Sequence, residues 1–327
     1  MQAAFYDRAG AAADVLQVGD LPDPQPAKGE VRVRMRWSGV NPSDVKARAG
    51  SRGMPYPRVI PHSDGSGAID TVGEGVAPSR VGKRVWIWNG AWQRPSGTAA
   101  QFICVPAEQA VDMPDGVADE AGACFGIPAL TALHAVLTDG GVAGRRVLVA
   151  GGAGGVGHYA IQFARLLGAR QVLSTASTEA KQKLARDAGA DLVVDYRKPD
   201  AADQLRAATE GQGVDRIIEM DVAANAALNL AVMRPGATWA VYGSGKRDFE
   251  LPFTPLILNE VLLRFFIVYK LQPADRVKAN DLLAHFLRKG ALVHNVAAKV
   301  PLKDIVRAHE MVERGEVAGN VVLDIAG

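Results

Sequence analysis

The feature that most constrains the fold of this chain is a glycine-rich turn between an apolar strand and an amphipathic helix. The apolar run VLVA, within residues 145–150, is typical of a strand covered on both faces. Apolar residues at helical spacing then predict a helix over 155–169. Between them, Gly152, Gly154 and Gly157 fit the pattern G-x-G-x-x-G, which lets a pyrophosphate approach the backbone at a helix N-terminus. This context predicts a dinucleotide site, with a purely structural glycine turn as the alternative.

From about residue 122 onward, apolar runs alternate with helical patterns. Such an alternation predicts an α/β domain with a doubly wound parallel sheet and right-handed crossovers. The expected strands lie at 145–150, 171–177, 191–196, 214–220 and 238–244, with 262–270 as the last, and the expected helices at 155–169, 178–190, 199–211 and 223–236.

The first part of the chain has a different pattern. Short runs at 30–40, 66–76 and 83–90 read as strands bounded by glycine and proline, which favours a compact β unit. After Gln272, helices are expected at 275–290 and 302–315, and the closing strand NVVLDIA is expected to return to the β unit. The predicted domains are therefore 1–122, completed by 275–327, and 123–274.

Composition limits the classes of protein that need to be considered. A chain of 327 residues favours two domains, and 37 basic against 35 acidic residues give no reason to expect a nucleic acid or an anionic membrane as partner. Cys104 and Cys124 cannot form a disulfide framework or a four-thiolate zinc site. The start of the chain lacks a signal pattern, and 261–269 is too short to span a bilayer, so a soluble cytoplasmic protein is expected.

The end of the second expected strand indicates which dinucleotide is bound. An acidic residue there would hold the ribose hydroxyls of NAD, but hydroxyl side chains occupy 174, 175, 177 and 178, and Lys181 follows. Ser177, Lys181 and Tyr196 would suit a 2′-phosphate, so NADPH is the predicted cofactor. Alternatively, Ser177 or Thr178 only caps the helix and Lys181 is a solvated charge.

Taken together, these segments resemble the zeta-crystallin-type quinone oxidoreductases, a zinc-independent branch of the medium-chain dehydrogenase/reductases. The resemblance implies a GroES-like β domain beside a Rossmann domain, with the active site in the cleft. The stretches that carry it are GVNPSDVKARAG (39–50), IPHSDGSGAIDTVGEGV (60–76), GIPALTALHAVL (126–137), VLVAGGAGGVGHYAIQFAR (147–165) and VYGSGK (241–246).

The resemblance also implies that zinc catalysis is absent. Zinc-dependent relatives use a cysteine and a histidine–glutamate pair as ligands, and those positions correspond here to Asn41 and to Ser63–Asp64. His62 lies one residue early and is interpreted as a loop or hydrogen-bonding residue. No metal ligand is predicted.

The same resemblance implies the following cofactor contacts. Asn41 and Thr131 would lie near the nicotinamide and its ribose, whereas Ser177, Lys181 and Tyr196 would surround the adenosine phosphate. Many relatives have tyrosine where this chain has Lys46 and lysine where it has Asn320, which leaves the preferred substrate open. The remaining implied contacts are Ala153, Gly154, Gly155 and Val156 at the pyrophosphate, and Asn225, Gly243, Ser244, Phe266 and Asn320 along the cofactor wall.

The resemblance implies reduction of quinones by NADPH, with reduction of α,β-unsaturated carbonyl compounds as an alternative that the sequence leaves open. Asn41 and Lys46 are the candidate catalytic residues, as hydrogen-bond donors to the acceptor carbonyl. No residue stands out as a general acid. A nucleic-acid-binding or crystallin-like structural role is the non-enzymatic alternative, and a zinc alcohol dehydrogenase is the enzymatic rival.

The segment 262–270 is strongly apolar for an edge strand. An exposed apolar edge favours pairing with the same strand of a second copy, so a homodimer is predicted. Burial of this segment under the C-terminal helices is the alternative.

Overall fold

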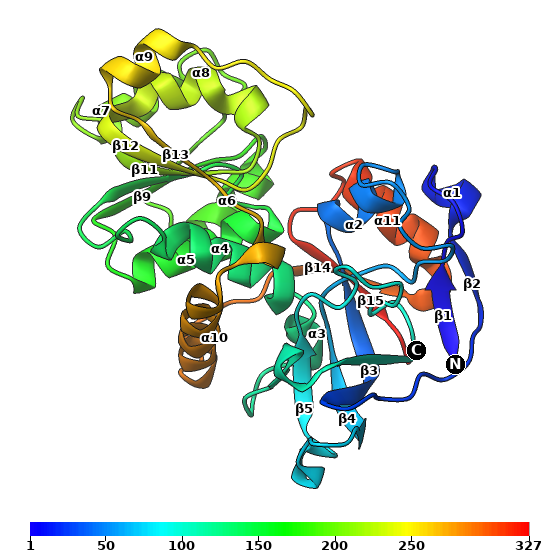
Figure 1. Cartoon of the computed structure of the whole chain (residues 1–327). Coiled ribbons are helices and arrows are strands. Elements are labelled where there is room, and N and C mark those ends of the chain that lie inside the picture. Colours follow the sequence, from blue (N-terminus) through cyan, green and yellow to red (C-terminus); the bar gives the residue numbers. More distant parts are fainter. Residues whose placement is uncertain (327) are drawn as a thin grey trace. The chain divides into compact units, whose positions relative to one another are not determined.

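The computed structural model describes residues 1–326 and divides them into two compact units (Figure 1). One, the β unit, contains Met1–Pro128 and the C-terminal residues from Ala284 onward, and the other, the nucleotide unit, contains Ala129–Leu283. The two units divide at 128/129 and 283/284, whereas the predicted domain boundaries lie at 122/123 and 274/275. The predicted domain boundaries stay predictions.

The β unit is built on a mainly antiparallel sheet with the strand order β14-β15-β3-β4-β5-β7, and β6 also pairs with β3. A separate hairpin-like pair joins β1 (Gln2–Phe5) and β2 (Gln17–Asp20). The strands of the large sheet are β3 (Glu30–Val40), β4 (Gly65–Val72), β5 (Arg84–Ile87), β6 (Phe102–Pro106), β7 (Ala110–Asp112), β14 (Val296–Pro301) and β15 (Asn320–Asp324). Its α-helices are α1 (Ala12–Val15), α2 (Pro42–Arg48), α3 (Asp119–Gly122) and α11 (Ile305–Glu313).

The long strand β3 organises this unit because its side chains alternate between the core and the surface. Val31 and Val33 are fully buried, while Arg32 and Arg34 between and after them lie against the Phe102 ring. The chain returns at its end, since β15 pairs antiparallel with β3. The predicted return of the closing strand to the β unit is confirmed.

The nucleotide unit holds a parallel sheet with the strand order β10-β9-β8-β11-β12-β13 within the described part of the chain. In chain order this is 3-2-1-4-5-6, the order of a doubly wound dinucleotide-binding fold, and the predicted fold class is confirmed. The strands are β8 (Arg146–Val149), β9 (Gln171–Thr175), β10 (Leu192–Val194), β11 (Val214–Glu219), β12 (Met233–Val241) and β13 (Leu262–Phe265).

Helices cover both faces of this sheet. Figure 1 shows α4 and α5 on one face and α7 and α8 on the other. Between these layers lies an apolar core that includes Leu148, Ile217 and Trp239. The helices are α4 (Leu130–Leu137), α5 (Gly155–Leu166), α6 (Glu179–Asp187), α7 (Ala201–Ala208), α8 (Val222–Val232), α9 (Phe253–Leu258) and α10 (Pro273–Arg288).

One expected helix boundary was wrong. The helix expected at 223–236 ends at Val232, and β12 already begins at Met233. Pro235 has no N–H for a helical hydrogen bond, and Gly236 has a φ of +74°, so the chain leaves the helix before them.

Candidate functional site

The glycine turn joins the end of β8 to the start of α5, as predicted. Gly151 has a φ of +68°, and a Cβ added to Gly152 would lie 2.1 Å from Oγ of Ser174, so the turn requires glycine at both positions. A Cβ at Gly157 would lie 2.3 Å from the carbonyl oxygen of Gly151. The sheet and the helix therefore approach each other as closely as a dinucleotide-binding turn requires.

Gly154 differs from these glycines because the fold leaves room beside it. The nearest atom to an added Cβ is the carbonyl oxygen of Gly151, at 3.3 Å. Gly154 is the N-cap residue of α5 and, as a glycine, has no side chain with which to cap this helix. The first N–H groups of a helix have no partner within it, so Gly155, Val156 and Gly157 present donors and positive partial charge at the turn. This uncapped end suits an anionic group.

The second predicted subsite follows β9 and β10, which are neighbours in the sheet. Thr178 accepts a hydrogen bond from the backbone N–H of Lys181 at 3.3 Å, so Thr178 caps α6, as one of the alternatives held. Ser177 and the segment after β10 lie together, since Arg197 donates to the carbonyl oxygen of Ser177. Tyr196 is 48% exposed beside it.

Arg197 is a candidate cofactor contact that sequence reasoning did not identify. Its guanidinium also pairs with Asp195 at 2.8 Å, and this contact lowers the pKa of the Asp195 carboxyl. The ion pair neutralises the carboxylate of Asp195, which follows β10. Arg197 thus lies beside the hydroxyl-rich end of β9, and Lys181 belongs to the first turn of the helix that follows it. Cations at these positions suit a phosphate.

Other predicted cofactor contacts lie at the carboxyl edge of the same sheet. Gly243 and Ser244 follow β12, and Phe266 follows β13, where its ring packs against His134 at a centroid distance of 4.7 Å. An added Cβ at Gly243 would lie 2.2 Å from the carbonyl oxygen of Met220, so this turn also requires glycine. Parallel strands end at one edge, so these residues share the edge that carries the glycine turn.

Asn225 and Thr131 lie on helices of the nucleotide unit. Asn225, on α8, donates to the Glu219 carboxylate at 2.8 Å. Thr131 is 4% exposed near the start of α4. Their contacts with a cofactor stay predictions.

In the β unit, Asn41 ends β3 and caps α2. Its backbone N–H donates to Oδ2 of Asp44 at 2.9 Å in a capping box, and its Nδ2 donates to Oδ1 of Asp64 at 2.8 Å. Asn41 is only 5% exposed. Burial raises the pKa of Asp44 to about 7, although hydrogen bonds from Asn41 oppose the shift. The Asp44 carboxyl, whose pKa lies near neutral pH, is therefore a neighbour of Asn41. Sequence reasoning did not identify Asp44 as a candidate site residue.

The other two predicted residues of this unit are placed differently. Lys46 is exposed on α2. Asn320 is buried at the start of β15, where its Nδ2 donates to the carbonyl oxygen of Asn295 at 3.1 Å. Asn320 thus joins two strands of the sheet, and its predicted approach to the cofactor is untested.

His62 is a hydrogen-bonding residue, as predicted, and belongs to a buried chain of polar groups. Thr98 donates to the carbonyl oxygen of Asp64 at 2.7 Å, so its own oxygen accepts from Ser38 at 2.7 Å. The Ser38 oxygen then accepts from Nδ1 of His62 at 2.9 Å. Nε2 of His62 is left to accept from Nε2 of His309, also at 2.9 Å.

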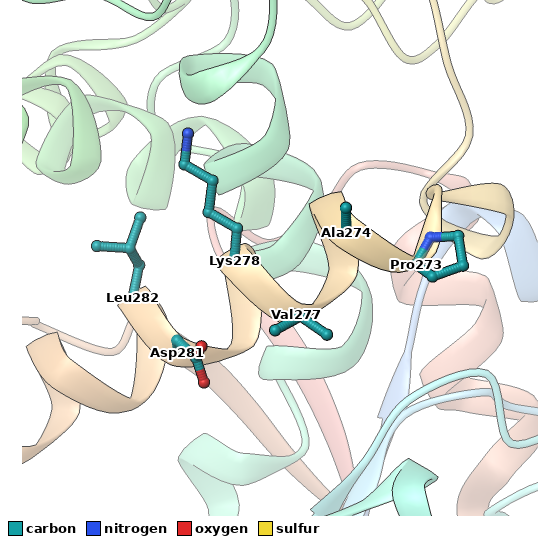
Figure 2. Close-up of a pocket in the computed structure, with 6 residues that line it drawn as sticks. All are labelled: Pro273, Ala274, Val277, Lys278, Asp281 and Leu282. Atoms are coloured by element: carbon teal, nitrogen blue, oxygen red, sulfur yellow. The ribbon is translucent and has the colours of Figure 1, made fainter.

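Metal clusters, membrane-spanning helices and cavities are the remaining features that bear on the candidate site. Within residues 1–326, no group of three or more His, Cys, Asp or Glu side chains is arranged to hold a metal ion. None of the helices described is long and apolar enough to cross a bilayer. A hollow of about 690 Å³ is lined only by residues 273–282 of α10, with Lys278 and Asp281 on that helix (Figure 2). It includes none of the predicted site residues.

The fold and the glycine turn define a two-domain oxidoreductase that uses a nicotinamide cofactor. Residues 155–285 match the family model described as zinc-binding dehydrogenase, and 27–115 match the alcohol dehydrogenase GroES-like domain. The quinone oxidoreductase of Sus scrofa is 33% identical over 293 residues, which are 89% of this chain and 87% of that protein. The chain belongs to the quinone oxidoreductases of the medium-chain dehydrogenase/reductase family.

Solved structures agree with this assignment. A mycobacterial protein in complex with NADPH is 30% identical, with 99% of each chain covered and a TM-score of 0.87. An NAD-dependent alcohol dehydrogenase is 29% identical, with 100% of each chain covered and a TM-score of 0.89. The predicted family and the prediction that the protein is an enzyme are confirmed. The two similar structures name different nicotinamide cofactors, NADPH and NAD, so the choice between them stays a prediction.

Proposed function

We propose that this protein reduces quinones with NADPH as the electron donor. The observation that carries the proposal is the start of α5 in the glycine turn, together with Arg197 beside Ser177 and Lys181 in the first turn of α6. The turn suits the pyrophosphate of a dinucleotide, and the cations suit an additional phosphate. The quinone oxidoreductase names of relatives and the NADPH in the mycobacterial structure support both halves of the proposal.

The residues of the nucleotide unit have distinct proposed roles in holding NADPH. Backbone groups of Ala153, Gly154, Gly155 and Val156 hold the pyrophosphate, because the first N–H groups of α5, from Gly155 onward, have no partner within the helix. Ser177, Lys181 and Tyr196 hold the adenosine phosphate, with Arg197 as an additional cation. Thr131, Asn225, Gly243, Ser244 and Phe266 form the wall on the nicotinamide side.

In the β unit, Asn41 and Asn320 are proposed to complete the nicotinamide side, and Asn41 and Lys46 to donate to the acceptor carbonyl. NADPH, when bound, supplies the hydride. A quinone gains negative charge on its carbonyl oxygen during reduction, and a hydrogen-bond donor held in place beforehand stabilises that charge. The buried amide of Asn41 is such a donor, since Asp64 already fixes one of its N–H groups.

Reduction of α,β-unsaturated carbonyl compounds is the second candidate. It requires a proton on carbon, and the observation that favours it is the buried Asp44 carboxyl, whose pKa is about 7. Turnover of 9,10-phenanthrenequinone and of a simple enone, each measured by loss of NADPH absorbance, separates the two. Preference for the quinone supports the proposal, and preference for the enone replaces it.

We also propose that the protein is a homodimer that assembles through β13. This strand lies at the edge of its sheet, and Leu262 and Phe265 are 43% and 54% exposed. Phe253, Ile257 and Leu258 of the adjacent α9 region are also exposed. A second copy of β13 offers matching backbone N–H and C=O groups and an equally apolar surface.

A cytoplasmic location completes the proposal. Cys104 and Cys124 are both free thiols, which suits a reducing compartment. Activity in the cytosolic fraction of the source cell supports this location, and activity confined to an exported fraction contradicts it.

A further inference from the structure

The carboxyl group of Asp64 lies fully buried next to the proposed donor Asn41. Its Oδ1 accepts from Nδ2 of Asn41 at 2.8 Å, and its Oδ2 accepts from the backbone N–H of Ile127 at 3.2 Å. No ion pair involves Asp64 in the described part of the chain. Both oxygens of this carboxyl thus serve as acceptors for N–H donors rather than for a cation.

Two glycines shape the space around this carboxyl group. A Cβ added to Gly39 would lie 2.5 Å from Oδ1 of Asp64, and a Cβ added to Gly126 would lie 2.7 Å from its Cβ. Real side chains do not approach so closely, so both positions must remain open for Asp64 to occupy its place. Segments separated by more than 20 residues in the chain therefore converge on one carboxyl group.

The backbone of Asp64 is held as firmly as its side chain. Its carbonyl oxygen accepts from Thr98 at 2.7 Å and from the backbone N–H of Gly39 at 3.0 Å. The chain of hydrogen bonds through Ser38 and His62 ends at this oxygen. Asp64 consequently has little freedom to move away from Asn41.

The partners of the Asn41 amide decide which way it faces. Its oxygen accepts from the backbone N–H of Asp44 in the capping box, and its nitrogen donates to Oδ1 of Asp64. The two ends of the Asn41 amide are nearly equal in size, but only its nitrogen can donate to Oδ1 of Asp64. When the amide nitrogen of Asn41 is fixed by Asp64, its second N–H lies at the same end of the amide. A rotated amide would present its oxygen to the oxygen of a substrate carbonyl, which is repulsive.

We propose that Asp64 is a positioning residue, which holds the Asn41 amide in the one orientation that offers an N–H to the acceptor carbonyl. The proposal rests on the proposed function, in which Asn41 is the donor. Burial and the neighbouring Asp44 raise the pKa of the Asp64 carboxyl, whereas its two N–H partners favour the ionised form.

The test compares Asn41→Ala, Asp64→Asn and the double variant, using the full chain with NADPH and 9,10-phenanthrenequinone. In Asp64→Asn, one amide oxygen must serve two N–H donors, so the Asn41 nitrogen loses an assured acceptor and only the capping box with Asp44 holds the amide. We expect kcat to fall by roughly 10- to 100-fold in Asp64→Asn, below the range of about 100- to 1,000-fold seen when a donor itself is removed. The dissociation constant for NADPH should stay within about twofold in a direct titration, because the glycine turn is intact.

The double variant gives the decisive readout. If Asp64 acts through Asn41, the double variant has the same kcat as Asn41→Ala, and the two losses do not multiply. Losses that multiply, or an Asp64→Asn variant with the kcat of the wild type, overturn the positioning role while the proposed function stands. An Asn41→Ala variant with the kcat of the wild type overturns the proposed donor itself.

A control separates positioning from general loosening of the β unit. Ser66→Ala removes a buried hydroxyl of the same unit, whose hydrogen bond goes to the carbonyl oxygen of Asp119 and not to the Asp64 carboxyl. It should lower the melting temperature but leave kcat within about twofold. A loss of kcat equal to that of Asp64→Asn contradicts the proposal. If Asp64→Asn does not fold, Asp64→Ser, which is smaller and lacks the carboxyl that holds the Asn41 nitrogen, replaces it.

Discussion

His309 donates from its Nε2 to Nε2 of His62 over 2.9 Å in the interior of the β unit, so two neutral imidazoles share one proton between facing nitrogens. A proton added to Nε2 of His62 would bring two N–H donors face to face. Burial, and to a smaller extent Arg48, lower the pKa of His309 to about 3. Burial, reinforced by His309, also lowers the pKa of His62 well below its ordinary value.

This pair predicts loss of stability in acid. The unfolded chain binds a proton at each histidine near pH 6.5, but the folded chain does not, so stability is complete above that pH and falls toward pH 3. The slope is up to about 1.4 kcal/mol per pH unit for each histidine. His309→Gln keeps an N–H donor and should show a smaller fall in melting temperature between pH 7 and pH 4.5. An equal fall contradicts the assignment, and the exposed His285→Gln is the control that should behave like the wild type.

The glycine turn predicts different effects for two neighbouring alanine substitutions. Gly154→Ala has room in the fold, so its stability should change by less than about 0.5 kcal/mol, but its methyl group would occupy the place of the pyrophosphate. Gly152→Ala would clash with Ser174 and should lose about 1–3 kcal/mol of stability. Melting temperature and NADPH titration measure both. Unimpaired NADPH binding by Gly154→Ala would contradict the assigned pyrophosphate site.

The cations near Ser177 predict selectivity for the phosphorylated cofactor. Lys181→Ala removes a charge-assisted hydrogen bond, worth about 1.5–3 kcal/mol, and should raise KM for NADPH about 10- to 100-fold with little effect on NADH. Lys183→Ala is the matched control, because Lys183 lies on the same helix and pairs with Asp187 at 2.7 Å. The same increase for both cofactors would mean that Lys181 does not contact the 2′-phosphate.

The exposed edge strand predicts a dimer that one charged patch can disrupt. Leu262→Lys combined with Phe265→Lys places two cations on β13, which would face the same two cations in a second copy. Sedimentation velocity should show a dimer for the wild type and a monomer for this variant. Val81→Lys, at a 49% exposed site of the β unit, should remain dimeric. A monomeric wild-type protein would refute the interface.

Local patterns were sufficient to predict much of this structure. The strand before Gly152 and the helix after it are continuous in the sequence, so apolar spacing and glycine positions define the turn. The alternation of strands and helices also predicted the parallel sheet, because each unit of that fold is short. The edge position of 262–265 followed from its place as the last strand.

Features that depend on distant residues could not be predicted in this way. His62 and His309 are separated by 247 positions, and no spacing rule connects them. The contact of Arg197 with Ser177 depends on the pairing of β9 with β10. Asp64 was compared only with a zinc-ligand position of relatives, whereas its hydrogen bonds to Asn41 and Ile127 arise from tertiary packing.

The most direct test of the proposed function is the loss of NADPH absorbance on addition of 1,4-benzoquinone, repeated with NADH and in the presence of a chelator. Turnover that is several-fold faster with NADPH and insensitive to the chelator is the predicted result. Turnover that requires a removable metal, or that is faster with NADH, would contradict the account.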